Sequence, residues 1–535
     1  MRVLLISPRP PSTFWSFEEA LALVGQKALM PPLGLITVAA LLPQHWQLRL
    51  IDEQVRPVSE ADWRWGDLVI LSGMLVQRQG LARLIAEAKG HGLTVAVGGP
   101  FATSTPEAPE LRQADHLILD EGEETIPLFL EALERGETRG IHRASQRADV
   151  SRSPVPRFDL LDRDAYHVMA VQFSRGCPFQ CEFCDIIVLY GRKPRTKEPE
   201  QLLRELDVLL ALGWRGEVFL VDDNFIGNRR NGRRLLEALL SWQRQRGWPL
   251  RFSTEASLDL AEDPDLLAAM VDGGFQRVFL GIETPDGASL MQAGKRQNLR
   301  HPLLEAVETI RGQGLQVMGG FILGFDGEQE GAGERIRRFV EDAAIPLAMV
   351  GVLQALPNTA LWQRLQAEGR LLEVKDGFDQ GVQTHLLNFI PSRPMAQIAA
   401  EFLACFDALY TPEAFLERAF RSCLQQGRQR SGPIPRCGVS RLSGGSLRGL
   451  LILFWRQGLR RPSRWRFWQQ LGLLLMHRPR ALGDFLWLLL IEEHMLRYRE
   501  LVHGQVGAQL ASPLLQETAM VPLPLPAAEQ VAAAP

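Results

Sequence analysis

Cysteine is scarce in this chain of 535 residues: there are six in all, and none precedes Cys177. Three of them, Cys177, Cys181 and Cys184, fall within eight residues, which is not the spacing of a secreted disulfide framework. Such a group indicates metal ligation in a reducing compartment. The first residues also lack the basic and apolar regions of a signal peptide, so the chain is expected to be cytoplasmic.

Other features are missing as well. No run of eighteen uninterrupted apolar residues occurs, so a spanning helix is not expected. A nucleotide-binding Gly-x-Gly-x-x-Gly fingerprint and a phosphate-binding Gly-Lys-Ser loop are both absent, which argues against NAD or ATP binding. The net charge of -3 gives no reason to expect nucleic acid as a partner. The length favours two or three domains.

Residues 1–145 alternate between short apolar runs and helical patterns. Continuous Val/Ile/Leu runs separated by helices are typical of an α/β fold with a doubly wound parallel sheet. Strands are expected at 3–7, 48–52, 68–72, 95–98 and 117–119. Ligands bind at the carboxyl ends of such strands, where the sequence offers Ser72-Gly73-Met74 and Gly98-Gly99. These small residues allow close approach by a large flat ligand, or they only make tight turns.

A linker is expected at 146–167, where Pro154 and Pro156 favour an extended chain. A second alternating series fills 168–390 and suits a full or partial (β/α) barrel, with its chemistry at the carboxyl ends of the strands. Six strands are expected, at 169–173, 218–221, 251–255, 278–282, 317–323 and 349–353. Five helices are expected between them, at 199–212, 233–245, 263–272, 303–313 and 334–343.

The C-terminal part is predicted to be a helical domain at 391–507, followed by a disordered tail at 508–535. From Arg421 to Arg480 there are thirteen arginines and no Asp, Glu or Lys, with tryptophans and aliphatic runs between them. Arginine and tryptophan on apolar helices are typical of contact with an anionic membrane surface, which we expect through 421–495. An ordinary helical domain with a basic outer face is the alternative, and nucleic-acid binding fits the aliphatic runs less well.

The three clustered cysteines carry the strongest chemical signal. Their spacing of four and then three, on a loop after an expected strand, allows three thiolates to hold three corners of one iron-sulfur cubane and leave the fourth iron open. Zinc would need a fourth ligand nearby, and neither His167 nor the distant cysteines complete a zinc spacing. Buried structural thiols are the other alternative.

The segment Ser174-Arg-Gly-Cys-Pro-Phe-Gln-Cys-Glu-Phe-Cys-Asp185 resembles the Cys-x3-Cys-x2-Cys motif of the radical S-adenosylmethionine (SAM) superfamily, including the aromatic Phe183 before the last cysteine. The resemblance implies a [4Fe-4S] cluster on Cys177, Cys181 and Cys184. It also implies that the open iron binds SAM and that one electron then yields methionine and a 5'-deoxyadenosyl radical.

The same resemblance assigns cofactor-binding roles to later strand ends. Asp222 or Asp223 would accept from the methionine amino group, and Glu255 with Ser257 lies on the strand that binds the ribose. Glu283 and Leu323 belong to glycine-containing strand ends near the adenine and the substrate. Each carboxylate has a surface or capping role as its alternative.

A parallel sheet ahead of such a barrel resembles the Rossmann-like cobalamin-binding domain of the class B radical SAM methyltransferases. Ser72-x-Met74 and Gly98-Gly99 are similar to that domain's Ser-x-Leu and Gly-Gly elements, with Met in place of Leu. The Asp-x-His-x-x-Gly element is missing, so no histidine is expected as a lower cobalt ligand. Phe454-Trp455, Phe467-Trp468 and Glu492-Glu-His-Met495 resemble the subgroup that includes hopanoid methylases.

The resemblance implies a cobalamin-dependent enzyme that methylates an unactivated carbon of a small-molecule or lipid substrate, with hopanoids as the leading candidate. A one-electron reductant of the flavodoxin or ferredoxin type would be needed, and peripheral contact with the inner face of the membrane is expected. Two alternatives stay open. One is oxidative cyclisation or rearrangement without methyl transfer, and the other is a non-catalytic iron-sulfur or cobalamin sensor.

Overall fold

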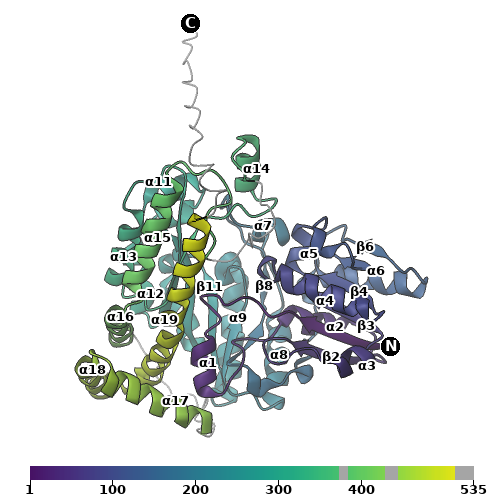
Figure 1. Ribbon diagram of the computed structural model, residues 1–535. Helices are drawn as coiled ribbons and strands as arrows, with labels where there is room; N and C mark the ends of the chain where they lie inside the picture. Colours follow the sequence, from purple (N-terminus) through teal and green to yellow (C-terminus); the bar gives the residue numbers. More distant parts are fainter. Residues whose placement is uncertain (373–383, 428–443, 512–535) are drawn as a thin grey trace.

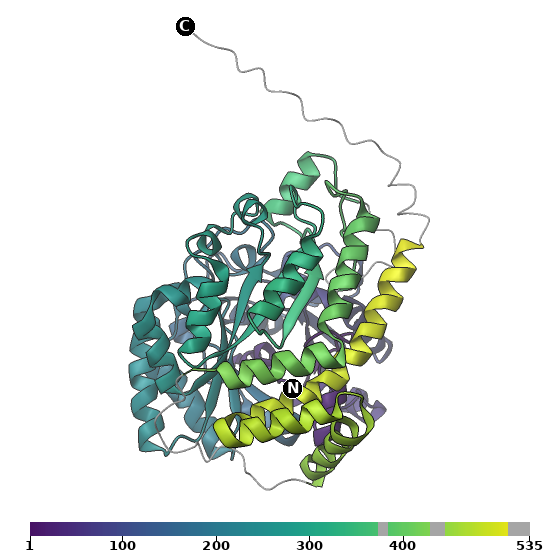
Figure 2. The same ribbon diagram turned by 90° about the vertical axis from the view of Figure 1, so that its left-hand side faces the viewer.

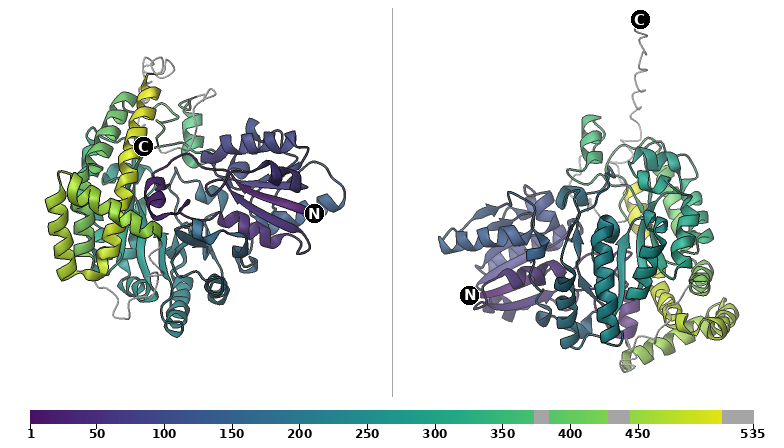
Figure 3. Two further views of the ribbon diagram at one scale, coloured as in Figure 1. Left: turned by 60° about the horizontal axis from the view of Figure 1, so that its bottom comes forward. Right: turned by 180° about the vertical axis from the view of Figure 1, so that it is seen from behind.

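The computed structural model describes residues 1–372, 384–427 and 444–511, without the side chains of 444–446. Two parallel sheets and a C-terminal group of helices make up this part of the chain (Figure 1). Figure 3 shows the N-terminal sheet beside the second sheet, with the C-terminal helices on the side away from the N-terminal sheet. The α/β fold class predicted from sequence is therefore confirmed.

The N-terminal sheet has six parallel strands in the order β2-β1-β3-β4-β5-β6. Their bounds are β1 Arg2–Ser7, β2 Gln47–Asp52, β3 Leu68–Ser72, β4 Thr94–Gly98, β5 His116–Ile118 and β6 Gly140–His142. One face packs against α2 (Leu33–Leu41) and α6 (Gly122–Glu134). The other packs against α3 (Glu60–Trp65), α4 (Arg78–Gly90) and α5 (Pro100–Ser104). Because both faces are covered, the sheet is doubly wound, and β6 is a strand that sequence did not predict.

The second sheet supplies the barrel, with all six expected strands in the order β14-β13-β12-β11-β10-β7. The strands are β7 Val168–Val171, β10 Glu217–Leu220, β11 Arg251–Ala256, β12 Phe275–Glu283, β13 Gln316–Leu323 and β14 Ala348–Val352. Since β7 and β14 are edges that do not pair, the barrel is partial rather than full.

Helices connect successive barrel strands and cover the outer face of the sheet (Figure 2). The main ones are α8 Pro199–Ala211, α9 Arg229–Gln245, α10 Pro264–Gly273, α12 Leu303–Gly312 and α13 Ala332–Asp342, with α11 Gly287–Gln292 and α14 Ala360–Ala367 as shorter elements. Between β7 and α8, a small hairpin of β8 (Ser174–Arg175) and β9 (Arg195–Thr196) encloses α7 (Ile186–Leu189).

The linker predicted at 146–167 is not simply extended, because it contains three short 3-10 turns, at Val150–Arg152, Phe158–Leu160 and Arg163–Ala165. It is tied back to the first domain at its end. The Tyr166 hydroxyl lies 3.1 Å from a carboxylate oxygen of Asp52, and burial raises the pKa of that carboxyl.

The C-terminal part is helical, as predicted. Its elements are α15 Met395–Leu409, α16 Pro412–Gln425, α17 Gly444–Trp455, the π-helix η9 Arg456–Arg460, α18 Arg464–His477 and α19 Leu482–Leu510. α15 packs on α13, and α19 packs on α15, α16 and the N-terminal helix α1 (Glu18–Val24). Helix α19 runs to Leu510, so the disorder predicted from Ala508 is wrong for residues 508–510. The rest of the predicted tail, residues 512–535, lies outside the described residues. None of the helices in the described ranges has the length and apolarity needed to cross a membrane.

Candidate active site

The cysteine loop, residues 176–185, follows β8 and leads into α7. Gly176 precedes the first cysteine with φ of 94°, and a Cβ there would lie 2.8 Å from the carbonyl oxygen of Gly191. Only glycine fits this turn without strain. The amide of Cys177 donates to that same Gly191 carbonyl at 3.3 Å, which holds the start of the loop against β9's side of the hairpin.

Two side-chain amides face the thiols. Asn224 Nδ2 lies 3.9 Å from Cys177 Sγ, and Gln297 Nε2 lies 3.7 Å from Cys181 Sγ. Burial raises the pKa of Cys184 to about 12 and also raises the pKa of Cys177. Neutral amide donors beside sulfur adjust the reduction potential of a cluster without adding charge. Neither amide was singled out from sequence.

The chemistry of these residues fits an iron-sulfur cluster rather than a single metal ion. Within the described residues, no three His, Cys, Asp or Glu side chains are placed to hold one metal ion. A cubane makes a different demand, because each thiolate binds its own iron atom. Three thiols on one loop, with amide donors at two of the sulfurs, meet that demand.

The paired aspartates after β10 hold the cysteine loop in place. Asp222 is buried and accepts from the amides of Phe173 and Ser174 at 2.8 and 2.9 Å, and from the Ser174 hydroxyl at 2.7 Å. Asp223 accepts from the amide of Gly176 at 2.7 Å. Burial raises the pKa of Asp222 to about 7 and that of Asp223 to about 6. Asp222 is thus occupied by the loop, which leaves Asp223 as the more accessible of the two predicted SAM acceptors.

Asn224, the residue after this pair, lines the site and keeps an acceptor without a partner among the described residues. Its Nδ2 donates to Ser257 Oγ at 3.1 Å, while its Oδ1 is buried with no hydrogen-bond partner among the described residues. Asn224 and Ser257 line a cavity of about 290 Å³ together with Pro178 and Phe179 of the cysteine loop. A buried acceptor without a partner fits a cofactor that brings a donor, such as the amino group of SAM.

Glu255 lies at the end of β11, partly exposed, and no protein hydrogen bond to its carboxylate is seen in the described part of the chain. Burial, together with the nearby carboxylates of Asp223 and Asp222, raises its pKa to about 7. A bound ligand that supplies hydroxyl donors or a positive charge would stabilise the ionised form of this carboxylate.

Glu283 ends β12 with φ of 66° and forms a buried ion pair with Lys295, which sequence did not single out. A Cβ on Gly281 would collide with both partners, so this glycine makes room for the pair. Lys295 Nζ also lies 5.9 Å from the ring centre of Phe183, whose ring packs edge-on against Phe325 at 5.8 Å. The predicted Leu323 is fully buried at the end of β13.

The predicted cobalamin-binding residues meet at one edge of the N-terminal sheet. Ser72 and Gly98 are register partners on β3 and β4. Gly99 has φ of 90°, and a Cβ there would lie 2.4 Å from Ser72 Oγ and 3.2 Å from the backbone of Gly73. The backbone is therefore packed too closely for a side chain. The Met74 side chain is exposed beside it, which leaves an apolar surface open to a flat ligand.

Comparison with known proteins gives three matches to family profiles. A B12 binding domain matches residues 23–130, the radical SAM superfamily matches 171–340, and a domain of unknown function (DUF4070) matches 359–508. A B12 binding domain followed by a radical SAM domain defines a cobalamin-dependent radical SAM enzyme, whose cofactors are a [4Fe-4S] cluster, SAM and cobalamin.

Two relatives match over nearly the whole chain. An uncharacterized methyltransferase of Synechocystis sp. is 55% identical over 95% of this chain and 94% of its own. The hopanoid C-2 methylase of Rhodopseudomonas palustris is 35% identical over 97% of this chain and 98% of its own. The chain therefore belongs to the cobalamin-binding radical SAM methyltransferases, in the subgroup that includes hopanoid methylases.

Solved structures agree on the fold. The cobalamin-dependent SAM radical enzyme OxsB, with aqua-cobalamin and SAM bound, superposes with a TM-score of 0.57 over 97% of this chain and 83% of its own, at 16% identity. The radical SAM methyltransferase TsrM from Kitasatospora setae gives 0.54 over 70% of this chain and 76% of its own, at 15% identity.

Proposed function

We propose that this methyltransferase acts on an unactivated carbon of a hydrophobic lipid, with a polycyclic hopanoid as the leading candidate. One observation carries the proposal, namely the end-to-end match with the hopanoid C-2 methylase, which includes the C-terminal helices beyond the cofactor domains. A match confined to the cofactor domains would carry no information about the substrate.

Cys177, Cys181 and Cys184 are proposed to hold the cluster, with Phe183 packing behind it. For SAM we propose Asp223 and Asn224 at the methionine end, Glu255 and Ser257 at the ribose, and Glu283 and Leu323 as strand-end positions near the adenine. Ser72, Gly73, Met74, Gly98 and Gly99 are proposed to receive cobalamin. When bound, these cofactors supply the radical and the methyl group, and the chain binds, orients and excludes water.

The mass of the reaction product tests the proposed substrate and the proposed methyl transfer. Purified protein, reconstituted with iron, sulfide and cobalamin, would be incubated with a hopanoid, a reductant of the flavodoxin type and SAM carrying a deuterated methyl group. We expect a product heavier by one labelled methyl. An unmethylated, rearranged product would instead support cyclisation, the reaction named for a relative that is 25% identical over 55% of this chain, the anaerobic magnesium-protoporphyrin IX monomethyl ester cyclase of Synechocystis sp..

Glu255 is expected to make SAM binding depend on pH. Its pKa of about 7 in the free site means that the carboxylate is largely neutral at pH 5 to 6, whereas the positive charge of SAM favours the ionised form. Affinity should therefore rise by up to about tenfold per pH unit below about 7 and level off above it. Calorimetric titration of SAM across this range would show the slope, and Glu255→Gln should flatten it between pH 6 and 7, whereas Asp223, with a pKa of about 6, still contributes a slope below pH 6.

The exposed carboxylate Glu237 on α9 provides the control, and Glu237→Gln should keep the wild-type slope. If Glu255→Gln also kept that slope, Glu255 would not contact the cofactor.

We also propose peripheral contact with an anionic membrane through the helical hairpin of α17, η9 and α18. Eight of the fourteen exposed large hydrophobic side chains among the described residues lie in this hairpin. They are Leu447, Leu451, Trp455, Leu459, Trp465, Trp468, Leu475 and Met476. The first four recur every fourth residue, so they share one face, and exposed apolar residues gathered in this way mark an interaction surface.

The charges of the hairpin fit a lipid surface. Arg456 and Arg461 pair with Glu493 at 2.6 and 2.7 Å, which anchors η9 to α19. Arg460 and Arg464 instead lie over the rings of Trp455 and Trp465, at 5.3 and 5.7 Å. Guanidinium groups beside exposed tryptophans suit a phosphate-bearing interface.

Helix α14 lies beside the cysteine loop, because its Arg364 pairs with Glu182 of that loop at 3.0 Å. The hairpin lies at the far end of the molecule from α14 (Figures 1 and 2). We therefore propose that it anchors the protein rather than forming the mouth of the active site.

Flotation with vesicles of phosphatidylcholine and phosphatidylglycerol tests the anchor. Leu451→Glu with Leu459→Glu should weaken binding by about tenfold or more, because burying one leucine is worth about 1.5–3 kcal/mol. Met291→Glu changes an equally exposed side chain on α11 and should float like the wild type. Unchanged flotation of the double variant would remove this surface from the proposal.

A further inference from the structure

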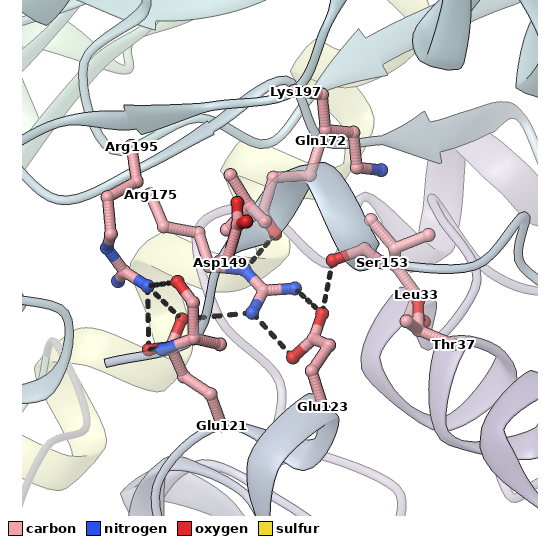
Figure 4. A network of polar contacts seen from close by, with 12 residues as sticks. Leu33, Thr37, Glu121, Glu123, Asp149, Ser153, Gln172, Arg175, Arg195 and Lys197 are labelled. Carbon is pink, nitrogen blue, oxygen red and sulfur yellow. Dashed lines mark hydrogen bonds and ion pairs between the residues drawn. The ribbon is translucent and has the colours of Figure 1, made fainter. Parts of the chain in front are cut away.

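Four charged side chains join the two cofactor domains (Figure 4). Glu121 and Glu123 stand at the start of α6, just after β5 of the N-terminal sheet. Arg175 on β8 and Arg195 on β9 belong to the hairpin that carries the cysteine loop. We call these four residues the interdomain clamp.

The contacts within the clamp are numerous and short. Arg175 Nη1 donates to Glu121 at 3.0 Å and to Glu123 at 2.9 Å, and its Nη2 donates to Glu123 at 2.8 Å. Arg195 Nη1 donates to both carboxylate oxygens of Glu121, at 2.9 and 2.8 Å. Figure 4 shows the Arg175 guanidinium directed at both carboxylates. The planar fork of arginine thus binds two acids of the other domain at once.

The clamp is shielded from water. The side chains of Glu121 and Glu123 are 2% and 7% exposed, and that of Arg175 is 13% exposed. Although burial acts to raise the pKa of Glu123, its hydrogen bonds to Arg175 and the charge of that arginine bring the pKa down to about 2. Buried charges that hold one another require fixed geometry, since removing one partner leaves the other charge uncompensated.

Further hydrogen bonds extend the same connection. The amide of Ala148 donates to Glu121 at 3.0 Å, and Gln172 Oε1 accepts from Arg175 Nε at 2.7 Å. The Ser153 hydroxyl lies 2.5 Å from Glu123. The linker, α6 and the hairpin therefore meet at one point, which makes rigid-body sliding between the domains costly.

The clamp lies close along the chain to both predicted cofactor edges. Arg175 is two residues before Cys177. Glu121 is three residues after Ile118, whose carbonyl oxygen a Cβ on Gly98 would approach to 2.9 Å. A displacement at the clamp would thus directly change the spacing between the cysteine loop and the strand ends that carry Ser72, Gly98 and Gly99.

We propose that Glu121, Glu123, Arg175 and Arg195 are positioning residues that fix the distance between the cobalamin edge and the cysteine loop, and thereby determine how much SAM cleavage ends in a methylated product. The proposal rests on the proposed function. A substrate carbon has to reach both cofactors within one turnover, so their separation matters more than the occupancy of either site.

The test uses the full chain loaded with both cofactors and the variants Glu123→Gln and Arg175→Lys. Glu123→Gln keeps the shape but removes one charge, and lysine cannot bind two carboxylates as a planar fork. Iron and cobalt per chain are measured first and should match the wild type. Pulsed electron paramagnetic resonance of the reduced cluster and cob(II)alamin then reports their separation, which should become more broadly distributed.

In the same samples, the ratio of 5'-deoxyadenosine to methylated product should rise by about tenfold for Glu123→Gln, the equivalent of about 1.4 kcal/mol. Arg135→Lys alters an exposed ion pair with Glu137 in the same domain and should change neither readout. Ser153→Ala keeps every charge of the clamp and should increase this ratio by less than Glu123→Gln does. It replaces Glu123→Gln in the test if that variant does not retain its cofactors.

An unchanged distance distribution or an unchanged ratio in any variant at the clamp or at Ser153 that retains both cofactors would overturn the proposal. A wrong proposal for the substrate would give a different result. The wild type would then give no methylated lipid, while the spectroscopic comparison between wild type and variants would still test the clamp.

Discussion

Replacing any one of Cys177, Cys181 or Cys184 with alanine is expected to abolish reductive cleavage of SAM. Each thiolate is proposed to bind a different iron, so the loss of one thiolate removes the protein ligand of that iron. The loss should be at least about a thousandfold, because the radical chemistry belongs to the cofactor. Formation of 5'-deoxyadenosine under dithionite, with iron per chain and the resonance of the reduced cluster, measures the effect.

Cys405 supplies the matched control. It is buried in α15, and burial raises the pKa of its thiol to about 12, as it does for Cys184. Cys405→Ala removes a buried thiol without touching the loop and should cleave SAM at the wild-type rate. Full cleavage by any of the three loop variants would contradict the cluster assignment.

Much of the fold could be predicted because parallel strands covered on both faces are almost wholly apolar. All six barrel strands and five of the six strands in the first sheet lie at or within three residues of the predicted bounds. The missed strand β6 (Gly140–His142) contains one large aliphatic residue, Ile141, and that side chain is exposed. Whether the barrel closes could not be predicted either, because closure depends on pairing between β7 and β14 rather than on either strand's sequence.

The site was only partly predictable. Strand ends locate Asp222, Asp223 and Asn224 together, but which of the three faces the cofactor depends on where neighbouring donors lie. The amides of Phe173 and Ser174 take up Asp222, and Asn224 keeps an acceptor without a partner. Lys295 and Gln297 come from a turn more than 110 residues after the cysteines, and nothing in that segment indicates contact with the loop.

Asp222→Ala is expected to release the cysteine loop. The change leaves two buried amides and one hydroxyl without an acceptor, and each unsatisfied buried donor costs about 1–3 kcal/mol. We expect the free energy of unfolding to fall by about 3 kcal/mol or more and the reconstituted protein to retain less than about half of its iron. Denaturant titration and iron analysis measure the two effects.

Two comparisons separate this positioning role from the role predicted by sequence. Asp159→Ala removes a carboxylate that pairs with Arg157 at the surface, and it should cost at most about 1 kcal/mol without loss of iron. Asp222→Asn keeps one oxygen acceptor and should fall between the wild type and Asp222→Ala in both measurements. If Asp222→Ala kept its iron and its stability but bound SAM more weakly, the carboxylate would contact the cofactor itself. Because its two oxygens already accept three donors in a buried position, we expect the iron to be lost first.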